Sequence, residues 1–307
     1  MEIHAGAVAS GVLGGDMQAK GLGIAITASA VIGIVVIGAL GARQATAGIA
    51  QSVHNLGTTG FGANPNGGAR NQFSGTAEIC VFCHTPHGGD ANAAVPLWNR
   101  RLKSPSSYQT YDQLGTSTLD AKVAPVGSVS LGCLSCHDGT LALDALINEP
   151  GSGANNAGFN AGTWTGNDIS SKMLAPGIVQ NLQPDLTNDH PIGMQYGGGG
   201  ISSSRPLLPQ GETNDPDFAK VQYKVENGRY FWWVDKDWRT GGDGERTKTD
   251  VILYTRDAGN GYAGQSGAEP FVECASCHDP HTTDNPTFLR ISNTETPSGL
   301  CLTCHVK

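Results

Sequence analysis

The feature that most constrains this chain is a five-residue pattern, two cysteines separated by two residues and followed at once by histidine, which occurs four times. The copies use all eight cysteines, Cys80 and Cys83, Cys133 and Cys136, Cys274 and Cys277, and Cys301 and Cys304. Two copies are extended by a proline and a second histidine, which gives Cys80-Val-Phe-Cys83-His84-Thr-Pro-His87 and Cys274-Ala-Ser-Cys277-His278-Asp-Pro-His281. Because the spacing is so short, the two thiols and the histidine of each copy can all contact the same bound group.

The chemistry of this spacing indicates covalent haem. Two thiols so placed can add to the two vinyl groups of a porphyrin, and the next residue, histidine, then reaches the iron from one face. Cysteine pairs at this spacing also bind zinc or form disulfides, which are the rival interpretations. Histidine is only nine of 307 residues, so its place directly after all four pairs favours haem. We predict four covalently attached haem c groups with four axial iron ligands, His84, His137, His278 and His305.

The N-terminal residues resemble an export signal. An uncharged apolar run over residues 21–41 is followed by Ala45-Thr46-Ala47, the small-x-small pattern that signal peptidases accept, so we predict a signal peptide over residues 1–47. Met17, with Lys20 just before the apolar run, is an alternative start. The run is also long enough to span a bilayer, so a retained membrane anchor is the alternative to cleavage. In either case the haem-bearing part lies outside the cytoplasm.

Four histidines then remain in the predicted mature chain for the opposite faces of four irons: His54, His87, His190 and His281. Their order repeats, because each half of the chain contains a lone histidine, a doubled motif and a simple motif. The second histidine of a doubled motif cannot reach the iron held three residues earlier, so we expect His87 to serve the haem of His137 and His281 that of His305. This leaves His54 for the first haem and His190 for the third. Two imidazoles on every iron predict low reduction potentials.

The composition predicts a loop-rich fold. Glycine is 43 of 307 residues and hydrophobic residues are only 38 %, so four porphyrins would have to supply much of the core. We expect a mostly irregular chain with short α-helices at the motifs and a small antiparallel β-hairpin at Asn227-Gly228. The predicted parts are a two-haem module over residues 48–147, a Gly/Asn-rich linker over 148–189, and a second two-haem module over 190–307 with the hairpin inserted at about 221–255. The net charge of −8 argues against nucleic acid as a partner.

Several short segments together resemble secreted tetrahaem cytochromes of the OmcE type. They are Val53-His54-Asn55-Leu56, the doubled motif ending at His87, Pro96-Leu-Trp-Asn99, Leu134-Ser-Cys-His-Asp-Gly139, Asp189-His-Pro191 and Glu273-Cys-Ala-Ser-Cys-His-Asp-Pro-His281. The resemblance extends from His54 to His305. It implies an extracellular or cell-surface homopolymer with closely stacked haems, in which a distal histidine is supplied by the adjacent subunit. His54, on an arm near the predicted mature start at Gly48, is the candidate for that ligand.

The function expected from these observations is electron conduction without substrate chemistry. Histidine on both faces of every iron leaves no open position for a substrate, which argues against an oxidoreductase with a catalytic haem. The partners would be further copies of the chain and redox cytochromes or an extracellular acceptor. A soluble tetrahaem shuttle of the cell envelope and a membrane-anchored tetrahaem quinol dehydrogenase are the alternatives.

Overall fold

The computed structural model describes residues 48–60, 69–117, 119, 121–151, 157–198, 215–259, 267–294 and 296–306. The chain divides into two units, Met1–Gln44 and Ala45–Lys307, and all described residues belong to the second. The predicted signal segment, residues 1–47, lies outside the described residues. Within the ranges given, no helix is both long enough and apolar enough to cross a membrane.

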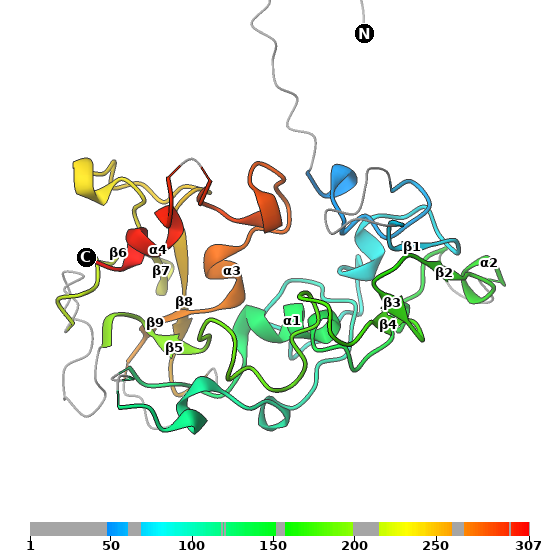
Figure 1. The fold of residues 1–307 in the computed structure, drawn as a ribbon, viewed down its shortest axis with the longest axis horizontal. Coiled ribbons are helices and arrows are strands. Elements are labelled where there is room, and N and C mark those ends of the chain that lie inside the picture. Colours follow the sequence, from blue (N-terminus) through cyan, green and yellow to red (C-terminus); the bar gives the residue numbers. More distant parts are fainter. Residues whose placement is uncertain are drawn as a thin grey trace, which may run out of the picture. The chain divides into compact units, whose positions relative to one another are not determined.

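A five-stranded antiparallel sheet is the largest regular element (Figure 1). Its strands are ordered β5 (Met194–Gln195), β9 (Glu269–Val272), β8 (Val251–Arg256), β7 (Arg229–Val234) and β6 (Gln222–Glu226). The predicted hairpin at Asn227-Gly228 is present between β6 and β7. Both turn residues have positive φ, 51° and 74°, as a tight hairpin turn requires.

The expectation of a mostly irregular chain with haem as its core is wrong. Seven apolar side chains of the sheet region pack into a protein core of their own: Tyr196, Ala219, Val221, Trp232, Val234, Val251 and Leu253. The predicted hairpin is extended by β8, then β9, then β5, because Trp232 and Val234 need a buried face that two strands cannot supply.

Short helices and two small sheets complete the described structure. The helices are α1 (Ser128–His137), α2 (Ala157–Asn160), α3 (Cys274–Cys277) and α4 (Gly299–Cys304). Strand β1 (Gln72–Phe73) pairs with β2 (Trp164–Thr165), and β3 (Ile169–Ser170) pairs with β4 (Met173–Leu174). The β1–β2 pair joins the segment predicted as a linker to the first module, and Phe73, Phe82 and Phe159 pack together beneath it.

A buried ion pair ties the second motif to the third. Arg256 of β8 donates to the Glu273 carboxylate at 2.6 and 2.9 Å, and both residues are about 1 % exposed. The other Glu273 oxygen accepts from the Ser130 hydroxyl of α1 at 2.6 Å, and that hydroxyl accepts from the Cys274 N–H at 3.0 Å. Glu273 also caps α3 through a reciprocal pair of hydrogen bonds with Ser276. Helices α1 and α3 are thus fixed against each other.

Candidate haem-attachment sites

Each cysteine pair lies on a single helical turn. Residues Cys80–Phe82 form a 3₁₀ turn, and the other three pairs lie in α1, α3 and α4. The histidine N–H closes the turn onto the first cysteine carbonyl at 2.7 Å for His84, 3.1 Å for His278 and 2.9 Å for His305. Side chains three residues apart share one face of such a turn, so the two thiols of each pair point the same way.

The two doubled motifs are held by identical backbone clamps. In the first, Thr85 N–H donates to the Leu97 carbonyl and Asn99 N–H donates to the Cys83 carbonyl, at 2.9 and 2.8 Å. In the third motif, Asp279 N–H donates to the Phe288 carbonyl and Arg290 N–H donates to the Cys277 carbonyl, both at 2.8 Å. The repeated order of histidines in the sequence therefore corresponds to a repeated local structure.

The clamps also fix the histidine rings. The Nδ1 atom of His84 lies 2.8 Å from the Pro96 carbonyl, and that of His278 lies 2.7 Å from the Thr287 carbonyl. A carbonyl oxygen can only accept, so in each ring Nδ1 carries the proton and Nε2 keeps its lone pair. Histidines that bind metals usually donate the other ring N–H in this way, which fixes the tautomer and orients the ring.

The second and fourth motifs carry related clamps. His137 has Nδ1 at 2.8 Å from the Gln180 carbonyl, and its own carbonyl accepts from Leu182 N–H at 2.8 Å. Val306 N–H donates to the Asp217 carbonyl at 2.7 Å, and Ala219 N–H donates to the Cys304 carbonyl at 2.8 Å. Phe218 and His305 thereby form an antiparallel β-bridge. The Phe218 ring lies 4.6 Å from the His305 ring. Four separate segments of the chain thus hold the four attachment histidines.

The motifs form a row in sequence order. Burial, and then the nearby Cys136 thiol of the second motif, raises the pKa of the Cys83 thiol to about 12. Cys133 and Cys274 are hydrogen-bonded, which raises the pKa of Cys133 and lowers that of Cys274. Burial, and then neighbouring Cys277, raises the pKa of Cys304 to about 12. First, second, third and fourth motifs therefore follow one another in space.

The structure brings two of the four remaining histidines to the attachment histidines. Burial, and then nearby His137, His281 and His278, lowers the pKa of His54 to about 3. The His281 ring lies near the His84 ring, with 6.3 Å between ring centres. The other two histidines, His87 and His190, are exposed, and no ring contact of theirs is found among the described residues. These ring contacts pair other histidines than the sequence order suggests, and the distal ligand of each haem stays a prediction.

Arg100 is a site residue that the sequence did not reveal. Its side chain is fully buried, and it donates to the carbonyls of Ser135, Ala142 and Leu143 at 2.7 to 3.3 Å. Its charge lowers the pKa values of Cys83 and Cys136 against the larger effect of burial. A cation thus lies between the first two motifs. The clamp segments were missed as well, since carbonyl acceptors leave no residue pattern.

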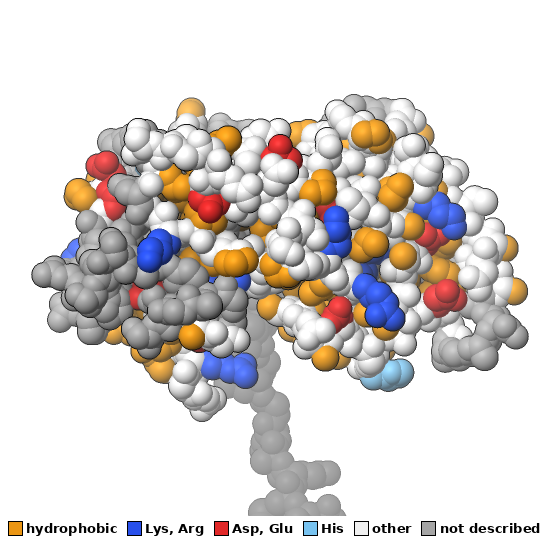
Figure 2. All heavy atoms as spheres, turned by 90° about the horizontal axis from the view of Figure 1, so that it is seen from below, with side chains coloured by type: hydrophobic (Ala, Val, Ile, Leu, Met, Phe, Trp, Pro, Cys, Tyr) orange, Lys and Arg blue, Asp and Glu red, His pale blue; other side chains and the backbone are white. Residues whose placement is uncertain are grey.

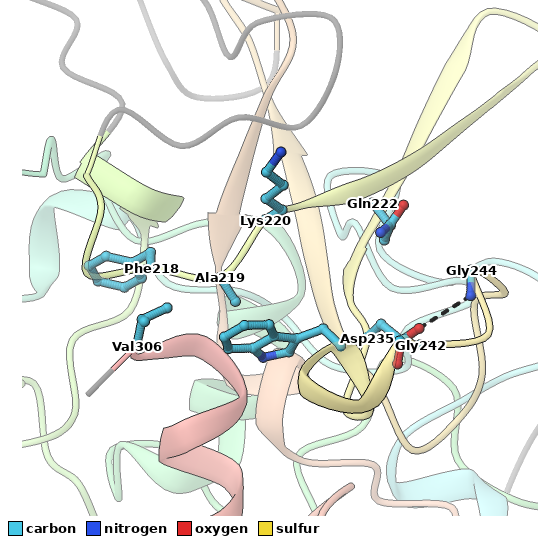
Figure 3. A pocket seen from close by; sticks show the side chains of 10 residues that line it. Phe218, Ala219, Lys220, Gln222, Asp235, Gly242, Gly244 and Val306 are labelled. Carbon is cyan, nitrogen blue, oxygen red and sulfur yellow. Dashed lines mark hydrogen bonds between the residues drawn. The ribbon is translucent and has the colours of Figure 1, made fainter.

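A pocket of about 370 Å³ lies beside the fourth motif (Figure 3). Phe218, Ala219 and Val306 form an apolar side of it, and Lys220 and Asp235 are among its polar lining. The Asp235 carboxylate accepts from the N–H groups of residues 237, 243 and 244, at 2.8 to 3.2 Å. These bonds give the carboxylate a structural role in holding its own loop.

The cysteines and histidines of the four motifs determine which cofactor the site can hold. All eight cysteines are free thiols in the structure. No set of three His, Cys, Asp or Glu side chains suited to a metal ion occurs in the described ranges. A porphyrin supplies four iron ligands itself and needs only the imidazoles, and His84, His137 and His278, with Nδ1 tied to a carbonyl and Nε2 free, meet that need. The residues therefore fit haem c.

Residues 269–307 match the family described as the doubled CXXCH motif. The chain thus has the haem c attachment motif of multihaem c-type cytochromes, a class that serves in electron transfer. The match covers the third and fourth motifs and leaves the first two outside it. No curated protein matches this chain.

Proposed function

We propose that the chain is a tetrahaem c-type cytochrome that conducts electrons, with histidine on both faces of each iron. The observation that carries the proposal is that a distant segment of the chain is hydrogen-bonded to each of the four motifs. The first motif, outside the family match, has the same two backbone hydrogen bonds as the third and fourth motifs inside it, and the second motif is held by one, from Leu182 N–H to the His137 carbonyl. Since the local structure is shared, the same attachment chemistry is proposed for all four.

The protein residues have three tasks in this function. The cysteines would anchor the porphyrin edges, the clamped histidines would present Nε2 to the irons, and the Ser130–Glu273–Arg256 network would keep the second and third motifs at a fixed separation. Haem supplies one-electron chemistry when bound. The row of motifs supports a path with its ends at the first and fourth haems.

The absence of a reactive open iron is part of the proposal. Eight histidines for four irons close every coordination position, so the protein would pass electrons to other redox proteins without transforming a substrate. Electron paramagnetic resonance and near-infrared magnetic dichroism test this. Four low-spin bis-histidine haems are expected; one persistent high-spin haem in the wild-type protein, or a methionine–iron charge-transfer band, would contradict it.

We further propose that the mature chain is secreted and polymerises into an extracellular filament. The support is the resemblance to OmcE-type cytochromes and the row of motifs, which would continue from copy to copy if chain ends meet. On the face shown in Figure 2, the described basic and acidic side chains are interspersed among scattered apolar ones, so that face offers no concentrated basic patch for nucleic acid.

Two measurements separate this proposal from its alternatives. Negative-stain microscopy of the sheared extracellular fraction should show uniform filaments, whereas a monomer alone would favour the soluble shuttle. Mass spectrometry of the mature N-terminus should begin at Gly48. A retained segment before that residue would instead favour the membrane-anchored quinol dehydrogenase.

A further inference from the structure

Two histidine pairs have a spacing that direct packing does not explain. The rings of His84 and His281 are 6.3 Å apart between centres and only 24° from parallel. The rings of His54 and His137 are 6.0 Å apart at 68°. For comparison, His54 stacks directly on Phe288 with ring centres 4.5 Å apart and an interplanar angle of 11°. The near-parallel His84–His281 pair is therefore too widely spaced for ring-on-ring contact.

The spacing fits one metal between two imidazoles. A bond from a metal to an imidazole nitrogen is about 2.0 Å, and that nitrogen lies roughly 1.2 Å from its ring centre. Two imidazoles on opposite sides of one iron therefore have ring centres roughly 6.4 Å apart. The angle between the rings about this axis is unrestricted, so both 24° and 68° are compatible with it.

The ring nitrogens of the first pair are arranged for this role. His84 has Nδ1 tied to the Pro96 carbonyl, and His281 has Nδ1 at 3.4 Å from the Asp279 carboxylate, so each keeps Nε2 for a metal. A carboxylate behind a ligating imidazole raises its basicity. The Asp279 carboxylate in turn forms an ion pair with the Arg290 guanidinium at 3.5 Å.

The N-terminal arm is tied to the same place. Gly48 N–H donates to the His281 carbonyl at 3.1 Å. A Cβ on Gly48 would come within 3.0 Å of that oxygen and 2.9 Å of the Thr283 nitrogen, so only glycine allows this approach. Ser52 accepts from the His54 N–H at 3.1 Å, which continues the arm toward the His137 ring.

We propose that His281 is the second axial ligand of the iron bound by His84, and that His54 is the second ligand of the iron bound by His137. This inference rests on the proposed haem function and assigns its ligands. It differs from the pairing expected from sequence order, in which His54 serves the first haem and His281 the fourth. A histidine of the second half would then complete a haem of the first half, and His87 and His190 would be left for the third and fourth irons.

The first test removes His281 in two backgrounds. His281→Ala in the four-haem protein should turn one haem in four high-spin, and added imidazole should restore it, which distinguishes ligand loss from misfolding. In a protein that lacks the first haem through Cys80→Ser and Cys83→Ser, the same change should leave the remaining three haems low-spin. A new high-spin haem in that background would overturn the assignment, because His281 would then serve another iron.

Matched variants keep the test decisive. His87→Ala is the control, since His87 has the same place in the other doubled motif; in the background without the first haem it should still produce one high-spin haem. If the Ala variant does not accumulate, His281→Met should give a methionine–iron charge-transfer band and one raised potential in the four-haem protein. That band should vanish when the first haem is absent, and its persistence would contradict the assignment.

The second test concerns His54. A monomer of the wild-type protein at high dilution should keep four low-spin haems, because the ligand comes from the same chain. One high-spin haem in that monomer, with filaments fully low-spin, would show that the ligand comes from an adjacent subunit. His54→Ala should lose its effect on spin state when Cys133→Ser and Cys136→Ser remove the second haem. Failure of the haem proposal itself would be distinct, since the wild-type protein would then contain fewer than four haems.

Discussion

Replacing Arg100 by Met should lower two of the four haem reduction potentials. Arg100 is 0 % exposed, and its charge acts on Cys83 and Cys136, which would anchor the first and second haems. A positive charge favours the reduced iron, which carries one positive charge fewer. No carboxylate in the described part of the chain forms an ion pair with Arg100 to cancel this effect.

The size of the shift follows from Coulomb's law. At a separation of roughly 10 Å and an effective dielectric constant of about 20, the interaction is about 1.7 kcal/mol. For a one-electron couple, about 1.4 kcal/mol corresponds to about 59 mV, so the expected decrease is roughly 70 mV. Arg239 offers a matched control, because it also donates to carbonyls of a motif, those of Leu302 and His305, but is exposed. Water around Arg239 should limit the shift of Arg239→Met to about 20 mV or less.

The assay is an optical redox titration resolved into four one-electron steps. Two steps should move down in Arg100→Met. Arg100→Gln, which loses the charge but keeps an amide donor for the carbonyls, should move them similarly and so separates charge from packing. Unchanged potentials in both variants, or an equal shift in Arg239→Met, would show that the buried charge of Arg100 does not set the two potentials.

Three further changes test the framework. Glu273→Gln should lower the free energy of unfolding by about 3–5 kcal/mol in chaotrope titrations, because it removes the charge that is paired with buried Arg256. Replacing both residues by apolar ones should lower it less, and a larger decrease in the double variant would contradict the ion-pair role. Gly228→Ala should cost about 1 kcal/mol from its φ of 74° alone, since nothing lies within 4 Å of the new methyl group. Asn99→Ala should destabilise the first motif by about 1–3 kcal/mol, because the Asn99 side chain joins Val81 and Asn148, and a neutral result would exclude that role.

Structure that depends only on neighbouring residues could be predicted from the sequence. Asn227-Gly228 predicted a hairpin because few residue pairs accept positive φ twice in succession, and the turn is there. The rest of the sheet depends on distant partners. Strand β5 has two residues and pairs with β9 more than 70 positions later, so neither shows a usable alternation. The low hydrophobic fraction also gave no indication that Tyr196, Trp232 and Leu253 gather in one core.

Of the candidate site, too, only the part that depends on neighbouring residues could be predicted from the sequence. The cysteines and attachment histidines follow from spacing, because one helical turn brings them to one face. The clamps at Pro96, Gln180 and Thr287 use backbone carbonyls, which any residue carries, so no residue type marks them. The partner of a distal histidine depends on how distant segments fold together, and sequence order alone did not lead to the pairing proposed for His281.

The most direct test of a tetrahaem protein is the mass of the intact mature chain, followed by its haem-bearing peptides. We expect a mass increase of four haems over the polypeptide and one haem on each peptide that contains Cys80, Cys133, Cys274 or Cys301. Fewer than four haems, or a motif peptide with two free thiols or a disulfide, would contradict a tetrahaem cytochrome.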